Sequence, residues 1–176
     1  VSDSSGIVVY GDNNHDVVLP DTDNTGNIGA EILGSINPIN HVQRGTITGS
    51  PDAMLTVIET WQEAEQYTRD LMGTNVGHLF VSTRDYIDPT TLMPYPARRV
   101  DSFNEINRAA AEVKYGVADY TGRVASEARR DAFLLATGEV QSVTWYFYKS
   151  QKTGKGGPTK RLLEYLLSNG INVVYK

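Results

Sequence analysis

The C-terminal part of the chain alternates between helix and strand patterns, and this alternation limits its possible folds more than any other feature. Residues 120–138 are amphipathic and end in glycine, and residues 158–170 form a second helical segment that closes with Asn-Gly. Each is followed by a strand pattern, at residues 143–149 and 171–175. Strands joined through helices pair in parallel by right-handed crossovers. We therefore expect an α/β fold with a parallel section of sheet.

A further helix is predicted to begin at Ser50-Pro51-Asp52, where a capping residue, a proline and an acid of the first turn occur together. It should run to about Gly73, since apolar residues recur at helical spacing. These residues are Met54, Ile58, Trp61 and Met72. Glu65 falls on the same face, where a carboxylate is costly unless it is paired or binds a metal.

Three more strands are expected between this helix and residue 120, at residues 77–83, 97–103 and 106–114, with a proline-rich loop before the second. The third contains an alanine run that would also suit a helix, so a helical alternative stays open there. The predicted order is helix, three strands, helix, strand, helix, strand. It gives an α/β sandwich in which a mixed central sheet is flanked by helices.

The length of 176 residues and the hydrophobic content of 40% allow one main domain with a sizeable core. Residues 1–50 are rich in Gly, Asn, Asp and Thr, with β-branched runs at residues 7–10 and 16–19, and we expect a polar lead-in there. Residues 51–176 are expected to form the domain. No run of about 18 apolar residues and no basic and apolar leader occurs, so we expect no membrane-spanning segment and no export signal within the chain.

The net charge of −5 is unevenly distributed along the chain. Residues 1–97 hold 3 Lys and Arg against 13 Asp and Glu, whereas residues 98–176 hold 13 against 8. A basic C-terminal half can attract phosphate although the whole protein is acidic, because salt screens the more distant charges. The alternative is a surface whose solvated charges are unevenly spread.

The possible metal ligands are restricted by composition. Cysteine is absent, which excludes disulfides and thiolate zinc sites. Carboxylates are the remaining candidates, because His15, His41 and His78 lack neighbours at metal or catalytic spacing. Oxygen ligands favour magnesium or manganese, with zinc as an alternative.

The triplet Glu112-Val113-Lys114 is the main candidate for chemistry. In a strand, Glu112 and Lys114 share one face. The carboxylate can then hold a divalent metal while the ammonium group contacts a phosphate or the attacking water. Asp101 on the preceding strand could supply the second metal ligand across a hairpin, and Arg98 and Arg99 could hold flanking phosphates. The alternative is a solvated strand face, and a helical segment would separate the two side chains.

Five segments together resemble the restriction-endonuclease-like, PD-(D/E)xK-type toxin domains at the C-termini of bacterial polymorphic toxins, including filamentous haemagglutinin-like contact-dependent inhibition proteins and Rhs proteins. The resemblance covers roughly residues 95–176 and rests on the order and spacing of these segments: Arg98-Arg99-Val100-Asp101, Glu112-Val113-Lys114-Tyr115-Gly116, Arg130-Asp131-Ala132-Phe133-Leu134-Leu135-Ala136-Thr137-Gly138, Trp145-Tyr146-Phe147 and Thr153-Gly154-Lys155-Gly156-Gly157-Pro158-Thr159. Val100 stands where the family usually has proline.

The resemblance implies a restriction-endonuclease-like fold and metal-dependent hydrolysis of nucleic acid. It carries metal binding over to Asp101 and Glu112, assistance in hydrolysis to Lys114, and a helical glutamate to Glu65. It also implies a domain secreted as part of a larger toxin, acting in the cytoplasm of a target bacterium and blocked by a cognate immunity protein. The substrate is tRNA or DNA, with tRNA slightly favoured, and we expect a monomer. A non-catalytic protein-binding module is the alternative from another class.

Two remaining features allow both a functional and a structural interpretation. Gly154-Lys155-Gly156-Gly157 lacks the spacing of a Walker motif and is expected to be a tight connection, with Lys152, Lys155 and Lys160 as candidates for contact with backbone phosphate. The four aromatic residues 145–148 could stack on bases, but on a strand flanked by helices they are expected to be buried on both faces.

Overall fold

The computed structural model describes residues 9–12, 15–18, 43–54, 58–74, 77–81 and 86–176, and for the first two ranges only the backbone. The chain divides into two units, Val1–Ile39 and Asn40–Lys176. In the first unit, strands β1 (Val9–Asp12) and β2 (His15–Val18) pair antiparallel. Of the strands that the structure describes within residues 1–50, these two are displaced by one or two residues from the β-branched runs that predicted them, and a third, Ile47–Thr48, belongs to the second unit and was not predicted.

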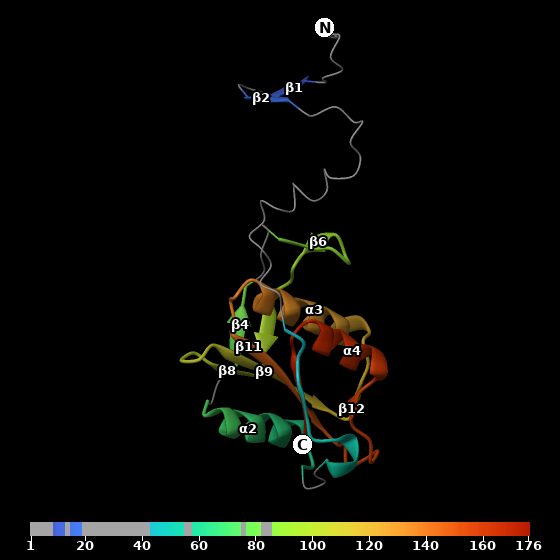
Figure 1. Cartoon of the computed structure of the whole chain (residues 1–176). Helices are drawn as coiled ribbons and strands as arrows, with labels where there is room; N and C mark the ends of the chain where they lie inside the picture. The colour runs from blue at the N-terminus through green and yellow to red at the C-terminus, as the bar shows by residue number, and fades with distance from the viewer. Residues whose placement is uncertain (1–8, 13–14, 19–42, 55–57, 75–76, 82–85) are drawn as a thin grey trace. The chain divides into compact units, whose positions relative to one another are not determined.

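The second unit is built around a five-stranded mixed sheet in the order β3-β13-β11-β9-β8 (Figure 1). Its strands, in that order, are β3 (Ile47–Thr48), β13 (Asn172–Tyr175), β11 (Ser142–Tyr148), β9 (Ala109–Tyr115) and β8 (Ser102–Asn104). Neighbouring strands are parallel except that β8 is antiparallel to β9. The expected mixed α/β architecture is confirmed, and so is the parallel pairing of the later strands.

Helices cover the two faces of this sheet (Figure 1). Helix α2 (Trp61–Met72) contacts β8 and β9, whereas α3 (Gly122–Ala136) and α4 (Lys160–Ser168) lie on the opposite face, against β11 and β13. Side chains of β11 alternate between two hydrophobic clusters: Trp145 and Phe147 belong to one, and Tyr148, with Tyr146 packed against it, to the other. The aromatic strand is therefore buried on both faces, as predicted.

Short paired strands complete the unit. They are β4 (His78–Phe80) with β7 (Arg98–Val100), β5 (Ile87–Asp88) with β6 (Met93–Pro94), and β10 (Val117–Ala118) with β12 (Gly157–Pro158). None of the helices in the described ranges is long and apolar enough to span a bilayer.

The first helix begins later than predicted. Ser50 precedes only the 3₁₀ turn η1 (Pro51–Ala53), and its side chain makes no capping hydrogen bond. Helix α2 instead begins after Thr60, whose hydroxyl accepts the Glu63 N–H at 3.2 Å, while the Glu63 carboxylate accepts the Glu59 N–H at 2.9 Å. The first bond satisfies one free amide of the first turn, and the second ties the turn to the residue before the cap, so together they fix the boundary where Pro51 does not. The predicted end at Gly73, in the left-handed conformation, is confirmed.

The alanine-rich segment is a strand, β9, and the helical alternative is wrong. Its seven residues pair with β11 from Ala109 opposite Ser142 to Tyr115 opposite Tyr148. Ala110 and Ala111 are buried beneath the helices. Small side chains allow the close approach of these layers, and pairing on both edges of the strand outweighs the helix propensity of alanine.

The strand predicted at residues 97–103 is divided at Asp101. Residues before it form β7, which pairs with β4, and residues after it form β8, which pairs with β9. The Asp101 N–H still donates to the Ala111 carbonyl at 3.1 Å, so the bend keeps this residue at the edge of β9. The strand expected at residues 77–83 appears as β4, and residues 82 and 83 lie outside the described residues.

Candidate functional site

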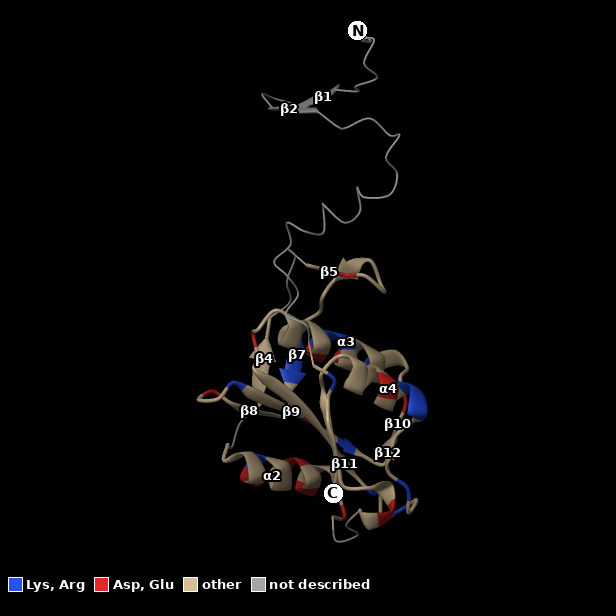
Figure 2. Ribbon diagram, in the orientation of Figure 1, with Lys and Arg blue, Asp and Glu red and all other residues tan. Residues whose placement is uncertain are grey.

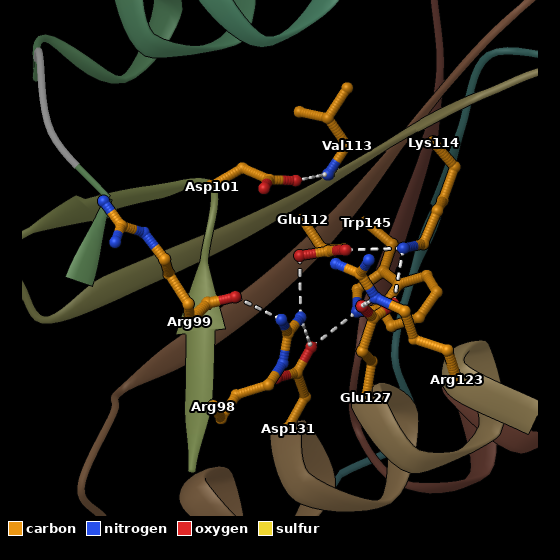
Figure 3. Close-up of polar contacts among 10 residues, drawn as sticks. All are labelled: Arg98, Arg99, Asp101, Glu112, Val113, Lys114, Arg123, Glu127, Asp131 and Trp145. Carbon is orange, nitrogen blue, oxygen red and sulfur yellow. Dashed lines mark hydrogen bonds and ion pairs between the residues drawn. The ribbon is translucent and has the colours of Figure 1, made fainter. Parts of the chain in front are cut away.

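Glu112 and Lys114 lie on one face of β9, as the period of two predicts. The Lys114 ammonium group lies 2.5 Å from Glu112 Oε1 and 2.6 Å from Glu127 Oε2 of α3 (Figure 3). Burial lowers the pKa of Lys114, but the attraction of the two carboxylates is larger and raises it overall. Lys114 therefore carries a positive charge in the folded protein and cannot act as a general base near neutral pH.

The second oxygen of Glu112 is held by Arg98. Arg98 Nη2 donates to Glu112 Oε2 at 2.7 Å, and the same guanidinium binds both oxygens of Asp131 at 2.7 and 3.1 Å. The Trp145 indole N–H also donates to Asp131, at 2.9 Å. Although burial lowers the pKa of Arg98, Asp131 and Glu112 raise it overall. The pKa of Asp131 is raised overall, because the effect of burial is larger than that of these three hydrogen bonds, which lower it.

These contacts form a continuous network of ion pairs, buried except for Arg123 at its solvent end. Its cations are Arg98, Lys114 and Arg123, and its carboxylates are Glu112, Glu127 and Asp131. Arg123 adds a 2.6 Å ion pair to Glu127 from the solvent side. Burial raises the pKa of Glu127, but Lys114, Arg98 and Arg123 lower it overall. Buried ion pairs gain little net stability, yet removing one member leaves an uncompensated charge and is strongly destabilising.

Asp101 lies outside this network. Its carboxylate is beside Val113 of β9, away from the contacts of Glu112 with Arg98 and Lys114 (Figure 3). Its Oδ2 accepts the Val113 N–H at 2.7 Å, in the place that a strand carbonyl would take if β8 extended further. It forms no ion pair within the described ranges. Burial raises the pKa of Asp101 to about 7, with the negative charges of Glu112 and Glu65 adding to the rise against the opposing Val113 hydrogen bond.

Glu65 approaches the site from α2. Its carboxylate pairs with Arg69 at 3.2 Å, and Arg69 Nε donates to the backbone carbonyl of Asp101 at 3.0 Å. Glu65 is half-buried, and its charge contributes to the raised pKa of Asp101. The structure thus brings Glu65 electrostatically close to Asp101 and links the two through Arg69.

The residues predicted to bind phosphate differ in their exposure to solvent. Arg98, expected to hold a flanking phosphate, is buried and bound by two carboxylates, so it is not free to do so. Arg99 is exposed, and its side chain points away from Arg98 (Figure 3). Lys152, Lys155 and Lys160 are exposed around the turn after β11 and the start of α4. Figure 2 shows basic residues on β7, α3 and α4 and acidic residues along α2.

Three site residues were given no role from the sequence: Arg123, Glu127 and Asp131. A signal for two of them exists, because Glu127 and Asp131 are four residues apart on the buried face of α3, with Ala128 and Leu134. Carboxylates on an apolar helix face need partners, so this spacing could have indicated a buried polar site.

The comparisons with known proteins return no relative for this chain. No protein-family model matches it, and neither a curated protein nor a solved structure does. The resemblance to PD-(D/E)xK-type toxin domains therefore stays a prediction from the sequence motifs. Among the residues that the structure describes, no group of three or more His, Asp or Glu side chains is arranged to hold a metal ion.

Proposed function

We propose that the unit Asn40–Lys176 is a metal-dependent endonuclease that hydrolyses phosphodiester bonds. One observation carries the proposal: Asp101, a half-buried carboxylate that forms no ion pair with any residue that the structure describes, lies at the edge of β9 close to Glu112, which pairs with Lys114. Two carboxylates and a lysine beside one strand of the central sheet suffice for metal-assisted phosphodiester hydrolysis.

The donors at this point fit a hard divalent cation. Asp101 has a pKa of about 7 because it is partly removed from solvent and lies near other negative charges, so a cation would stabilise its charged form. Glu112 is bound by Arg98 and Lys114, one on each oxygen, but a carboxylate offers about four lone-pair positions and can accept a further partner. Magnesium is commonly held by one or two carboxylates, with waters and substrate phosphates completing the shell. Asp101 and Glu112 would hold magnesium or manganese, with zinc as an alternative.

Such a metal, when bound, supplies a water of lowered pKa and neutralises charge on the phosphoryl oxygens. The chain itself contributes the remaining functions. Lys114, fixed by Glu112 and Glu127, keeps an ammonium group beside the metal ligands to stabilise the charge of the transition state. Arg98 holds the Glu112 carboxylate against Asp131 and thereby fixes its orientation. Arg69, itself paired with Glu65, holds the backbone at Asp101.

We further propose that this unit is a restriction-endonuclease-like toxic domain of a larger secreted bacterial protein. It would act on tRNA, or alternatively on DNA, in the cytoplasm of a competing bacterium, and a cognate immunity protein would block it in the producing cell. The support is the series of sequence motifs together with the mixed α/β sheet, which carries Glu112-Val113-Lys114 on β9 and Trp145-Tyr146-Phe147 on β11. The alternative of a non-catalytic binding module predicts no metal-dependent cleavage.

The test is incubation of the purified chain with total RNA and with genomic DNA, in EDTA and with each divalent metal in turn. Cleavage is expected with magnesium or manganese and should be abolished in Asp101→Ala, Glu112→Gln and Lys114→Ala. Glu105→Gln, which changes an exposed carboxylate in the turn after β8, is the matched control and should remain active. Circular dichroism verifies that each variant is folded. Retained cleavage in all three site variants would refute the proposal.

A further inference from the structure

A pocket of about 300 Å³ opens between β7 and α3, and three residues of the ion-pair network, Arg98, Arg123 and Glu127, line it. Among the residues that the structure describes, the lining is rich in arginine and contains a single carboxylate: Pro96, Ala97, Arg98, Arg99, Arg123, Ser126, Glu127 and Arg130. The volume is at the lower end of the range for small-molecule sites.

The charges around this pocket do not balance. The three cations of the network match its three carboxylates, so Arg98 and Arg123 are compensated by Asp131, Glu112 and Glu127. Arg130 and Arg99 also line the pocket, and neither forms an ion pair within the described ranges. Arg99 is exposed, so Arg130 on the α3 wall is the buried lining arginine without an ion pair, although the charges of Glu139 and Asp131 act on it against the burial that lowers its pKa.

Arg130 is also incompletely satisfied in its hydrogen bonding. Its side chain is 1% exposed and packs on the rings of Tyr95 and Phe133. Nη2 donates to the Val81 carbonyl at 2.9 Å, but the buried Nε and Nη1 have no hydrogen-bond partner among the described residues. Buried donors without partners are rare, and buried charges without partners rarer still, so this guanidinium indicates an anionic ligand.

We propose that the pocket binds a phosphate group of the nucleic-acid strand, anchored by Arg130 with Arg123 at the rim. A guanidinium matches the geometry of phosphate oxygens, and the planar ring contacts hold it in place. The single lining carboxylate, Glu127, limits the affinity for anions and joins the pocket to Lys114 at 2.6 Å. A phosphate held here would set the position of the strand relative to Lys114.

The inference that the phosphate belongs to a nucleic-acid strand rests on the proposed nuclease function. The inference that the pocket binds phosphate does not. The test therefore uses the full chain in EDTA, where no cleavage is needed. Calorimetry measures the binding of inorganic phosphate. Fluorescence anisotropy measures the binding of a labelled single-stranded RNA oligonucleotide and its displacement by phosphate.

Two variants of the pocket and one control variant test the proposal. Arg130→Gln is expected to weaken phosphate and oligonucleotide binding about tenfold, through loss of a charge-assisted contact. Glu127→Gln is expected to tighten phosphate binding about threefold or more, because the only lining carboxylate loses its charge. This gain cannot come from misfolding, so it decides the matter if Arg130→Gln fails to fold. Arg161→Gln, which changes an exposed arginine of α4 outside the pocket, is the matched control and should bind as the wild type does.

Displacement of the oligonucleotide by phosphate, with both effects in the expected directions, supports the proposal. If phosphate affinity changes in the variants as expected but phosphate does not displace the oligonucleotide, the pocket binds phosphate that does not come from a nucleic-acid strand, and that part of the proposal is overturned. Equal phosphate binding in the wild type, Arg130→Gln and Glu127→Gln overturns the pocket itself. Absence of cleavage with any metal, with phosphate binding intact, would count against the nuclease proposal and not against the pocket.

Discussion

Replacement of Asp101 by asparagine should stabilise the metal-free protein at alkaline pH and have a smaller effect at acidic pH. The pKa of this carboxyl is about 7 in the folded protein and 3.8 in its ordinary state. A raised pKa means that the folded state holds the proton more tightly than the unfolded state does. The folded protein therefore loses stability as the pH rises from about 4 to 7, and above pH 7 the loss is complete.

The magnitude follows from these two values. A difference of one in pKa corresponds to about 1.4 kcal/mol, so the rise from 3.8 to about 7 corresponds to about 4 kcal/mol at high pH. At pH 5 the same linkage gives about 1.7 kcal/mol, so the wild type should lose about 2.5 kcal/mol between pH 5 and pH 8. An asparagine side chain keeps an oxygen able to accept the Val113 N–H but carries no charge, so Asp101→Asn removes this pH-dependent contribution.

The assay is urea denaturation in EDTA at pH 5 and pH 8, followed by circular dichroism. The advantage of Asp101→Asn over the wild type should grow by about 2.5 kcal/mol between the two pH values. Glu105→Gln, which neutralises an exposed carboxylate, should show no such difference and controls for the loss of one negative charge. An advantage that is equal at both pH values, or larger at pH 5, would refute the reasoning.

Three further predictions concern the core around the site. Arg98→Met should destabilise the protein by about 3–5 kcal/mol, because two buried carboxylates lose their guanidinium; a loss below about 1 kcal/mol in urea denaturation would contradict this. Thr68→Val removes a buried 2.8 Å hydrogen bond to the Tyr148 hydroxyl and should cost about 1–2 kcal/mol, with Tyr148→Phe giving a similar loss if the pair acts as a unit. Leu166→Ala empties a fully buried position of α4 and should lower the free energy of unfolding by about 2–5 kcal/mol, whereas an unchanged midpoint of thermal unfolding would show that α4 does not pack as described.

The C-terminal order of α3, β11, α4 and β13 was predictable because its signals are local. Helical periodicity, closing glycines and an aromatic strand are each read within a few residues, and parallel pairing follows from the helical connections. The start of α2 could not be predicted from the sequence, because two segments carry the residue types of a helix start. Ser50 with Pro51 has the residue types of a helix start, but the Ser50 side chain caps no amide, whereas Thr60 accepts the Glu63 amide and Glu63 accepts the Glu59 amide.

The site was predictable where it depends on one strand and not where it depends on packing between elements. The shared face of Glu112 and Lys114 follows from the period of two in β9. The ion pairs that hold Arg98 depend on how α3 packs against the sheet, and Asp131 lies 33 residues from Arg98 in sequence. An arginine next to a candidate metal ligand indicates phosphate binding when read locally. Its burial between Asp131 and Glu112 becomes visible only in three dimensions.

The hydrogen bond between the Asp101 carboxylate and the Val113 amide gives the protein a spectroscopic reporter of its own. An amide proton that points at a carboxylate shifts in its NMR resonance when that carboxylate gains a proton or a cation. Titration of the Val113 amide signal against pH would therefore follow Asp101 directly, and titration against magnesium would follow metal binding without any substrate. The same bond lies at the end of the β8–β9 pairing, so its hydrogen-exchange rate would report how firmly this sheet edge is closed in each state.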